Sequence, residues 1–478
     1  LHYSDEEKAF HADVLSDDAD AARLVYADWL EEHGDSRAEF IRVDVELDDM
    51  EINDPRAGGL NVSWKNLLDQ HGEEWHKPVA ALGLWPTLGT TYHPSLWMRR
   101  GLLQSVEVNL PGNLPDKADL LFQAIPLLRE LEVVDVRLDA GQAFTHPRMS
   151  QIQILEFANL ELTNKDVTDL AESNSLTGLR ELRLRGISLD LAAVKALASS
   201  SLLTGLESLD LSSCDLTADG VRSLCESAAT AGLKHLNLSG NSLDSEAVSI
   251  LAAAANLSRL EALDLSGSQP GEQGVRSLAR SQSLGKLTTL DLSDCDVNAA
   301  QAVLLAEGDL LSQLISLTLN NNSLEDAGAA ALAKANVNGR LRVLGLCNCE
   351  LASAGARALA ESPLLGDLQE LDLGENPLGD EGVVALASVA GSANWRIRNL
   401  DETACGEEGC AALANSPLLN GLLELELRGN EIGAEGASAL LGSESLENVG
   451  NLTLSEEAVP DDVRDALGEH FGDALIIL

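Results

Sequence analysis

A leucine pattern that recurs at every twenty-seventh position runs through most of this chain and limits what it can fold into. The pattern reads L-x-x-L-x-L-x-x-(N/C)-x-L, as in LKHLNLSGNSL from Leu233 and LQELDLGENPL from Leu368. Its first positions fall at residues 152, 179, 206, 233, 260, 287, 314, 341 and 368. Weaker copies start at Leu103, Leu128, Ile397, Leu422 and Val449, which makes 14 units. A constant period over so many copies predicts a repeat solenoid.

Each unit is expected to contain one short strand followed by one helix. Side chains alternate along a strand, so the fourth and sixth positions point inward and the fifth points outward. Segments such as DEGVVALASVA from Asp380 show the apolar spacing of a helix. The ninth position turns inward where the chain leaves the strand. There an amide can hydrogen-bond unpaired backbone groups and a thiol can fill the space. These residues are Asn241, Asn322, Asn376, Asn430, Cys214, Cys295 and Cys349.

Stacking such units predicts a curved α/β solenoid. Adjacent strands lie about 4.8 Å apart, whereas helix axes need about 10 Å, so the helix side of each unit is the wider one. The expected fold is a horseshoe with parallel strands on the concave face and helices on the convex face. The pattern resembles the ribonuclease-inhibitor type of leucine-rich repeat over residues 103 to 460.

The first hundred residues have a different composition. They hold five of the six Trp and all three Tyr, and their pattern predicts four helices, one of them over residues 18–33 before Gly34. The runs ARLVYADWLEEHGDSRAEFIRV, HGEEWHKPV and WMRRGLLQSVEV resemble a bacterial repeat-companion domain, to which no activity is assigned. We therefore expect a helical N-terminal cap over residues 1–101, an array of about 14 units over 102–459 and a C-terminal cap over 460–478.

Composition argues against several classes of function. The chain has 77 acidic and 32 basic residues, a net charge of −45, which opposes binding to nucleic acid. No apolar run approaches the length of a membrane span, so no membrane association is expected. Seven cysteines without CxxC pairs suit a reducing compartment, and we expect a cytoplasmic protein. The sequence starts at Leu1 without a signal peptide, and a signal removed upstream stays open.

No motif of an enzyme, cofactor site or metal site stands out. The chain has no P-loop, GxGxxG or GxSxG element, and His71 and His76 lack a metal-binding spacing. Asp28 in YADWL is expected to hydrogen-bond within the helical region. Cys347 and Cys349 form a CxC pair, of which one side chain should face out and the other in, so a shared metal or disulfide is not expected. We therefore expect a protein that is not an enzyme and that needs no cofactor or metal.

The fifth strand positions form the most informative surface. Nine of the fourteen are acidic, which favours a protein partner with a basic surface, although acidity of the whole chain can also reflect adaptation to salt. The candidate partner-binding residues are Asp210, Asp264, Asp291, Asp372, Glu426 and Trp395. The full set is Glu107, Glu132, Glu156, Arg183, Asp210, Asn237, Asp264, Asp291, Thr318, Gly345, Asp372, Asp401, Glu426 and Thr453.

One unit departs from the period. Counting its start from Ile397 gives steps of 29 and 25, and places Glu402 where an inward leucine belongs. A start at Trp395 restores the period but places Arg398 inward. Neither register fits, so we predict a local bulge that carries Trp395.

The expected function is a non-catalytic scaffold for protein–protein interaction that presents a curved acidic face. Three alternatives remain: an inhibitor that covers a basic enzyme, as the ribonuclease-inhibitor resemblance implies, an enzyme in the N-terminal region, and a self-associating structural component. Salt-dependent binding to cationic proteins would favour the inhibitor, and turnover by residues 1–101 would favour the enzyme. Sedimentation at several concentrations would reveal self-association.

Overall fold

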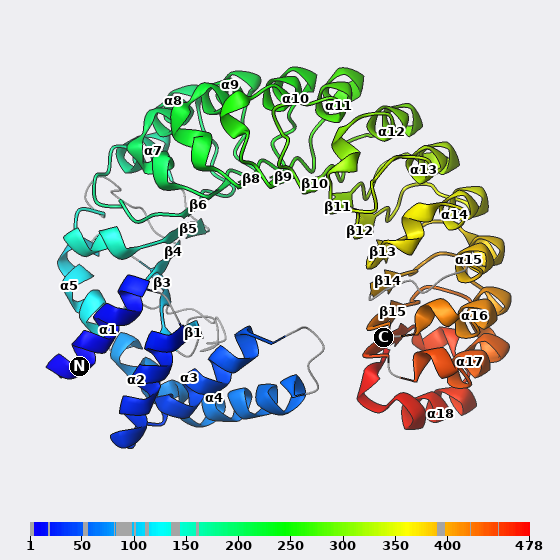
Figure 1. The fold of residues 1–478 in the computed structure, drawn as a ribbon, viewed down its shortest axis with the longest axis horizontal. Coiled ribbons are helices and arrows are strands. Elements are labelled where there is room, and N and C mark those ends of the chain that lie inside the picture. Colours follow the sequence, from blue (N-terminus) through cyan, green and yellow to red (C-terminus); the bar gives the residue numbers. More distant parts are fainter. Residues whose placement is uncertain are drawn as a thin grey trace. The chain divides into compact units, whose positions relative to one another are not determined.

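The computed structural model describes residues 4–17, 20–50, 56–80, 82, 98–99, 102–109, 114–134, 144–158, 162–389, 397–420, 422–447 and 449–478. The chain divides into two compact units, Leu1–Asp210 and Leu211–Leu478. In each unit the strands line the concave side of a curved solenoid and the helices lie on the convex side (Figure 1). The predicted fold class is confirmed. Within the described ranges, no helix has both the length and the apolar character needed to cross a bilayer.

Unit 1 begins with four helices: α1 (Asp5–Asp17), α2 (Asp20–Glu32), α3 (Arg37–Asp48) and α4 (Ala57–Ala80). The turn after α2 uses Gly34 with a φ of +70°, a conformation that glycine adopts without steric cost. Val14, Tyr26 and Leu30 from these helices share one apolar cluster with Leu102 and Leu127 of the repeat region. The four predicted helices are confirmed.

The rest of unit 1 contains a short antiparallel pair and the first repeats. The pair consists of β1 (Met98–Arg99) and β2 (Leu102–Leu103). The parallel strands are bonded to one another in chain order. The repeat elements are β3 (Ser105–Asn109), α5 (Leu114–Ala124), β4 (Glu130–Val134), β5 (Ile154–Ala158), α7 (Asn164–Ala171), β6 (Glu181–Arg183), α8 (Leu191–Ser199) and β7 (Ser208–Asp210).

Unit 2 continues the alternation of helix and parallel strand, and its strands also follow chain order. Each helix has eight or nine residues up to α17, which is enough to cover one repeat. Its elements are α9 (Ala218–Glu226), β8 (His235–Asn237), α10 (Ser245–Ala252), β9 (Ala262–Asp264), α11 (Gly271–Ala279), β10 (Thr289–Asp291), α12 (Ala299–Ala306), β11 (Ser316–Thr318), α13 (Glu325–Ala333), β12 (Val343–Gly345), α14 (Ser353–Ala360), β13 (Glu370–Asp372), α15 (Gly379–Ala387), β14 (Ile397–Asn399), α16 (Glu407–Ala414), β15 (Glu424–Glu426), α17 (Gly433–Leu441), β16 (Asn451–Leu454), α18 (Asp461–Phe471) and β17 (Leu475–Ile477).

The inward positions of each strand build the core. In β9 and β10, the leucines at positions four and six, such as Leu263 and Leu265, are at most 1% exposed. Burying a leucine side chain stabilises the fold by about 1.5–3 kcal/mol, and the array repeats this gain strand after strand. The period of the sequence is therefore a period of buried leucines.

Each ninth-position asparagine ties its own repeat to the one before it. The Asn376 side chain is fully buried, and its Oδ1 accepts from the backbone N–H groups of Cys349 and Leu351, both at 2.9 Å. Its Nδ2 donates to the carbonyls of Leu346, Leu373 and Gly374. Each asparagine thus reaches back to the turn of the preceding repeat. Asn241, Asn322 and Asn430 do the same for the turns at Cys214, Cys295 and Thr403.

The irregular repeat keeps the normal step, and its register starts at Trp395. Strand β14 pairs Ile397 with Glu370 before it and with Glu424 after it, each one full repeat period away. Arg398 therefore occupies an inward leucine position, and it is fully buried. The start at Ile397 was wrong because one arginine in a leucine position hid the pattern. The predicted bulge at Trp395 lies outside the described residues.

The C-terminal end holds a helix and a strand, and the sequence did not predict the strand. Helix α18 lies in the region where we expected a C-terminal cap. The apolar tail after it forms β17, which pairs in parallel with β16 through Leu452–Leu475 and Leu454–Ile477. The tail ALIIL lacks the L-x-x-L-x-L pattern, which concealed its role as a strand.

Candidate functional site

The fifth positions of the strands lie side by side on the concave side of each unit, and we call them the position-five row. The strand pairs place Glu107 beside Glu132, and Asp264 beside Asp291. In the irregular repeat the member is Asn399, which pairs with Asp372 and Glu426. The assignment of Asp401 to the row was wrong, because that repeat starts two residues earlier. Eight members are acidic: Glu107, Glu132, Glu156, Asp210, Asp264, Asp291, Asp372 and Glu426.

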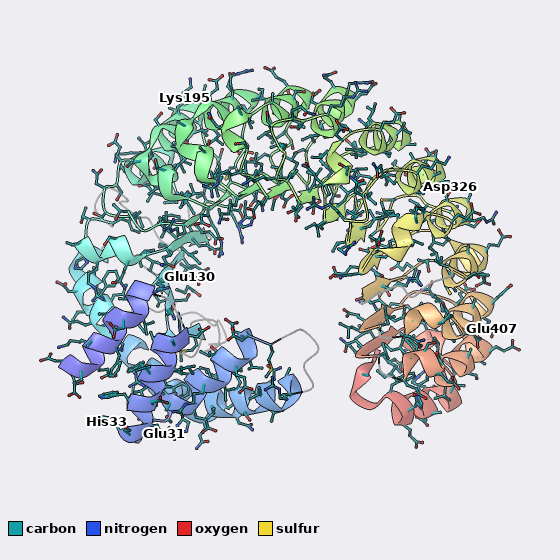
Figure 2. The ribbon with its side chains drawn as sticks, viewed as in Figure 1. Glu31, His33, Glu130, Lys195, Asp326 and Glu407 are labelled. Atoms are coloured by element: carbon teal, nitrogen blue, oxygen red, sulfur yellow. The ribbon has the colours of Figure 1, made fainter. Side chains whose placement is uncertain are left out.

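Figure 2 separates this concave side from the helix side of each unit. Glu130 lies on strand β4, next to the row in unit 1, whereas Lys195 lies on helix α8 at the outer surface. In unit 2, Asp326 and Glu407 lie on the outer helices α13 and α16. Charged residues therefore occur on both sides, and only those on the strands are held at the spacing of a sheet.

Three neighbouring glutamates form the acidic end of the row in unit 1. Glu132 lies between Glu107 and Glu156 on adjacent strands. Burial, together with the charges of Glu156 and Glu107, raises the pKa of Glu132 to about 7. Within the described part of the chain, the Glu132 carboxylate has no hydrogen bond or ion pair. Its charge would therefore be stabilised by a cation brought to it, or removed by a proton.

Two arginines neutralise the other end of the row in unit 1. Arg183 bonds Glu156 at 2.5 Å and Glu181 at 2.6 Å. Arg185 Nε donates to Asp210 Oδ2 at 2.7 Å, and Asp210 is only 6% exposed. Asp210 was expected to face a partner, but its charge is already compensated within the unit.

In unit 2 the aspartates of the row also shape the turn after their strand. Asp264 Oδ1 accepts from Ser266 N at 2.9 Å and from Ser266 Oγ at 2.7 Å. Asp291 and Asp372 accept from the backbone N–H groups of Ser293 and Gly374 in the same way. Asparagine makes the same turn hydrogen bond, because the side-chain oxygens of Asn237 and Asn399 accept from the backbone N–H groups of Ser239 and Asp401. The frequent aspartate at this position therefore has a local structural cause.

These carboxylates are nevertheless poorly solvated. Burial is the main cause that raises the pKa of Asp291, and the neighbouring charge of Asp264 adds to it. Burial also raises the pKa of Asp372, against the hydrogen bond from Gly374 N. The pKa of Glu426 is raised by burial and by Asp401. A cationic group brought to this face would find carboxylates that gain from the contact.

The row is not uniformly acidic in unit 2. Thr318 and Gly345 separate Asp291 from Asp372 and leave a neutral stretch two strands wide. Beyond it, Asp401 is 8% exposed and binds Arg428 through Oδ2, with Nε at 2.7 Å. Sequence reasoning missed this pair because it assigned Asp401 to the wrong position. The remaining candidate, Trp395, lies outside the described residues.

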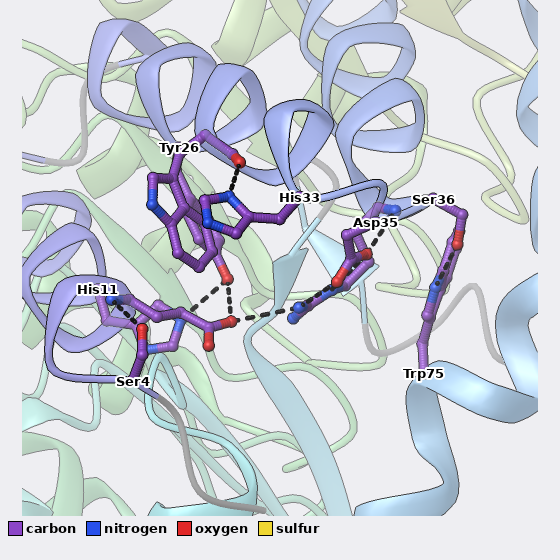
Figure 3. A network of polar contacts seen from close by, with 10 residues as sticks. Ser4, His11, Tyr26, His33, Asp35, Ser36 and Trp75 are labelled. Atoms are coloured by element: carbon purple, nitrogen blue, oxygen red, sulfur yellow. Dashed lines mark hydrogen bonds and ion pairs between the residues drawn. The ribbon is translucent and has the colours of Figure 1, made fainter.

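A second group of polar residues lies in the N-terminal helices of unit 1 (Figure 3). Tyr26 Oη donates to Glu7 Oε1 at 2.7 Å, and His11 Nε2 lies 3.3 Å from Tyr26 Oη. Arg37 bridges Glu7 at 3.2 Å and Asp35 at 2.7 Å. Burial lowers the pKa of His11 to about 4, so its imidazole is neutral at pH 7. This network joins α1, α2 and α3.

A cavity of about 960 Å³ lies beside the network. Its lining includes His33, Asp35, Arg37, His71 and Trp75, and Trp75 Nε1 donates to Ser36 Oγ at 3.3 Å. The cavity combines aromatic surface with a paired arginine and aspartate. Among the described residues, no three His, Cys, Asp or Glu side chains gather into a group that could hold a metal ion.

The other residues singled out from the sequence have ordinary surroundings. Asp28 is 71% exposed and receives a 2.7 Å bond from Arg42, in agreement with the hydrogen-bonding role expected for it. Cys349 is buried, with its Sγ 3.0 Å from the Leu319 carbonyl oxygen, whereas Cys347 is half-buried, in agreement with one inward and one outward thiol. All seven cysteines are free thiols.

Comparison with known proteins found matches to repeats. A family model described as Leucine Rich repeat matches residues 204–225, 286–302, 367–387 and 422–441, and another, Leucine Rich Repeat, matches residues 232–253. Comparison with curated proteins found no match. Among solved structures, an internalin (inlF) from Listeria monocytogenes str. 4b F2365 is 16% identical, with 79% of this chain and 93% of that chain covered and a TM-score of 0.42. The Rad7 and Elc1 complex in yeast is 14% identical, with 90% and 98% covered and a TM-score of 0.44. The family matches show that this chain contains leucine-rich repeats between residues 204 and 441.

Proposed function

We propose that this chain is a non-catalytic protein-binding scaffold whose position-five row receives a partner with a basic surface. The observation that carries the proposal is the row itself: each unit holds four acidic side chains in register on parallel strands, and among the described residues only Glu156 and Asp210 of these are already paired with arginine. Leucine-rich repeat solenoids typically act as scaffolds for protein–protein interaction. A partner that supplies Lys or Arg would pair with carboxylates whose own neighbours destabilise their charge.

The rigidity of the strands supports binding at low entropic cost. Row residues on inner strands, such as Asp264, are fixed by strand pairings on both sides, and in unit 2 the aspartate side chains are fixed further by their turn hydrogen bonds. Both hydrogen bonds of Asp264 end on Oδ1, which leaves Oδ2 for a partner. A surface ordered in advance loses little side-chain freedom on association.

The N-terminal helices are proposed to act as a cap for the array. Arg129, at the start of the second repeat, donates to the carbonyls of Val14 at 2.9 Å and Leu15 at 3.3 Å at the end of α1. An array of repeats exposes leucines at its end unless another element covers them. We further propose the ribonuclease-inhibitor type for the repeats, the companion domain for the cap and the cytoplasm as the location, where free thiols persist.

A charge-neutralised row tests the binding proposal. The variant D264N, D291N and D372N keeps the turn hydrogen bonds, because Asn237 and Asn399 already make them, and removes three charges. The matched control E246Q, E272Q and E381Q removes three exposed charges from helices α10, α11 and α15.

The measurement is capture from native lysate at two salt concentrations, followed by the Kd of the captured protein for the three chains. The proposal expects a basic protein that binds the parent chain and the helix variant alike, binds the row variant at least tenfold more weakly, and is released by salt. Equal binding by all three chains, or binding that salt does not change, would refute it.

A further inference from the structure

The repeat that starts at Trp395 contains a pair of touching thiols. Cys405 Sγ and Cys410 Sγ lie 3.6 Å apart, and neither residue is exposed. Cys405 ends the turn after β14, and Cys410 belongs to the first half of α16. No other pair of cysteine sulfurs is in hydrogen-bond contact, and all seven cysteines lie in the described part of the chain.

The thiol pair replaces an apolar pair that seats the helix on its turn in the other repeats. Positions 11 and 16 of the repeat are buried and apolar on both sides of it, as in Leu378 with Val383 and Ile432 with Ala437. A Cβ added at Gly409 would lie 2.8 Å from Cys405 Sγ, and one at Gly382 would lie 3.0 Å from Leu378 Cβ, so the slots are equivalent. The other pairs are Leu216/Val221, Leu243/Val248, Pro270/Val275, Val297/Ala302, Leu324/Ala329 and Leu351/Ala356.

Packing alone does not require two sulfurs at this place. Eight other repeats fill the same two positions with hydrocarbon side chains, which cannot be oxidised. A disulfide needs its sulfurs about 2.05 Å apart, so the two thiols must approach by about 1.5 Å, which side-chain rotation can supply. The two residues are five apart, at a turn and the helix that follows it.

We propose that Cys405 and Cys410 are a site of reversible oxidation, which forms a disulfide within this repeat by exchange with a low-molecular-weight disulfide such as oxidised glutathione. The thiolate of one cysteine attacks oxidised glutathione, expels one glutathione thiolate and leaves a mixed disulfide. The other cysteine thiolate attacks the protein sulfur of that mixed disulfide and expels the second glutathione thiolate. The two cysteine protons pass through water to the two glutathione thiolates, so the protein loses two electrons and glutathione gains them.

Burial sets the rate of this reaction rather than its outcome. The hydrogen bond with Cys405 and burial both raise the pKa of the Cys410 thiol, so little thiolate exists while the repeat is closed. Oxidation therefore proceeds when the start of α16 opens locally. Cys347 is half-buried, and the Sγ of its neighbour Cys349 points inward to the Leu319 carbonyl at 3.0 Å. Among the described residues Cys347 therefore has no partner thiol, and it serves as an internal reference for the oxidation experiment.

Peptide mass spectrometry of the full chain tests the proposal. After incubation with oxidised glutathione, acid quench and alkylation, trypsin releases residues 399–428, which contain Cys405 and Cys410 and no other cysteine. We expect this peptide to lose both alkylation sites and to be two hydrogen atoms lighter than the reduced peptide. Cleavage after Glu407 or Glu408 should leave its two parts joined until a reductant is added. Cys347 has no partner thiol in the described part of the chain, so any oxidation there should add one glutathione and form no cross-link.

Two variants control the experiment. C405L with C410V restores the apolar pair of the preceding repeat and should fold, give the same far-UV circular dichroism and form no cross-link. C410V alone should leave glutathione on Cys405. A parent peptide in which both cysteines are alkylated, or in which each carries its own glutathione, would overturn the proposal.

Discussion

Replacing Asn376 by alanine should damage the repeat before it more than its own. The side chain satisfies two backbone N–H groups, those of Cys349 and Leu351, and three carbonyls. A buried donor without a partner costs about 1–3 kcal/mol, so the two donors alone cost about 2–6 kcal/mol. We expect a loss of about 4 kcal/mol for N376A.

Two control variants separate this effect from ordinary packing loss. C349A removes a thiol whose bonds to the Leu319 and Cys347 carbonyls are weak, and should cost about 1 kcal/mol. N320A removes a half-buried amide that accepts one bond, from Cys347 N, and should also cost about 1 kcal/mol.

Hydrogen exchange combined with urea unfolding measures the effect. In N376A the amides of Cys349 and Leu351 should exchange about a thousandfold faster, since each 1.4 kcal/mol is about a factor of ten. The urea midpoint should fall more than in C349A or N320A. The reasoning is refuted if the three variants lose the same stability, or if these two amides stay protected.

Three further perturbations have defined outcomes. The pKa of Glu132 is raised to about 7, so its charge destabilises the folded chain above that pH, and this penalty fades as the pH falls toward 4.5. E132Q should therefore have a free energy of unfolding about 1 kcal/mol higher than the parent at pH 8 and no higher at pH 4.5, as measured by urea titration. The pKa of His11 is lowered to about 4, so its contribution to the free energy of unfolding is complete above pH 6.5 and is lost as the pH falls toward 4. In H11Q the free energy of unfolding should therefore depend less on pH between 6.5 and 4. Asp380 Oδ1 accepts hydrogen bonds from Gly406 N and Gly409 N at the start of α16. D380A should lower the free energy of unfolding by about 1–2 kcal/mol and speed amide hydrogen exchange in that helix. Amides of α16 that stay as protected as in the parent would contradict the capping role.

Where the sequence succeeded, one residue type at one position decided the structure. A leucine at position four or six has only the core to go to, so a period of leucines defines strand register, curvature and the members of the position-five row. The inward asparagines and Cys349 were predictable for the same reason, because a small polar group at a turn needs backbone partners.

The sequence-based predictions failed where the contact that fixes a residue's position comes from another repeat. Arg398 broke the leucine pattern locally, yet β13 and β15 on either side hold its strand in register. Burial lowers the pKa of Arg398 to about 9, because this arginine lies in the core, whereas arginine side chains usually lie at the surface. Thr403 was not recognised as a ninth-position residue because the shifted start hid it. The pairing of Asp210 with Arg185 required knowledge of which side chains meet across strands.

The asparagine contacts imply that the stable unit of unit 2 is a pair of repeats rather than one. Asn376 serves the turn at Cys349 and Asn430 serves the turn at Thr403, so each Cys or Thr repeat depends on the Asn repeat that follows it. Deletion of residues 341–394 removes one whole pair and leaves every remaining Cys or Thr turn with its asparagine. Deletion of residues 368–394 removes half as much chain but takes Asn376 away from a turn that stays. We therefore expect the shorter deletion to lower the thermal unfolding midpoint more than the longer one, measured by circular dichroism. If single repeats were the independent units, the longer deletion would lower the midpoint at least as much as the shorter one, because it removes more interfaces between repeats. A midpoint for the longer deletion that is equal to or below that of the shorter one would rule out the paired unit.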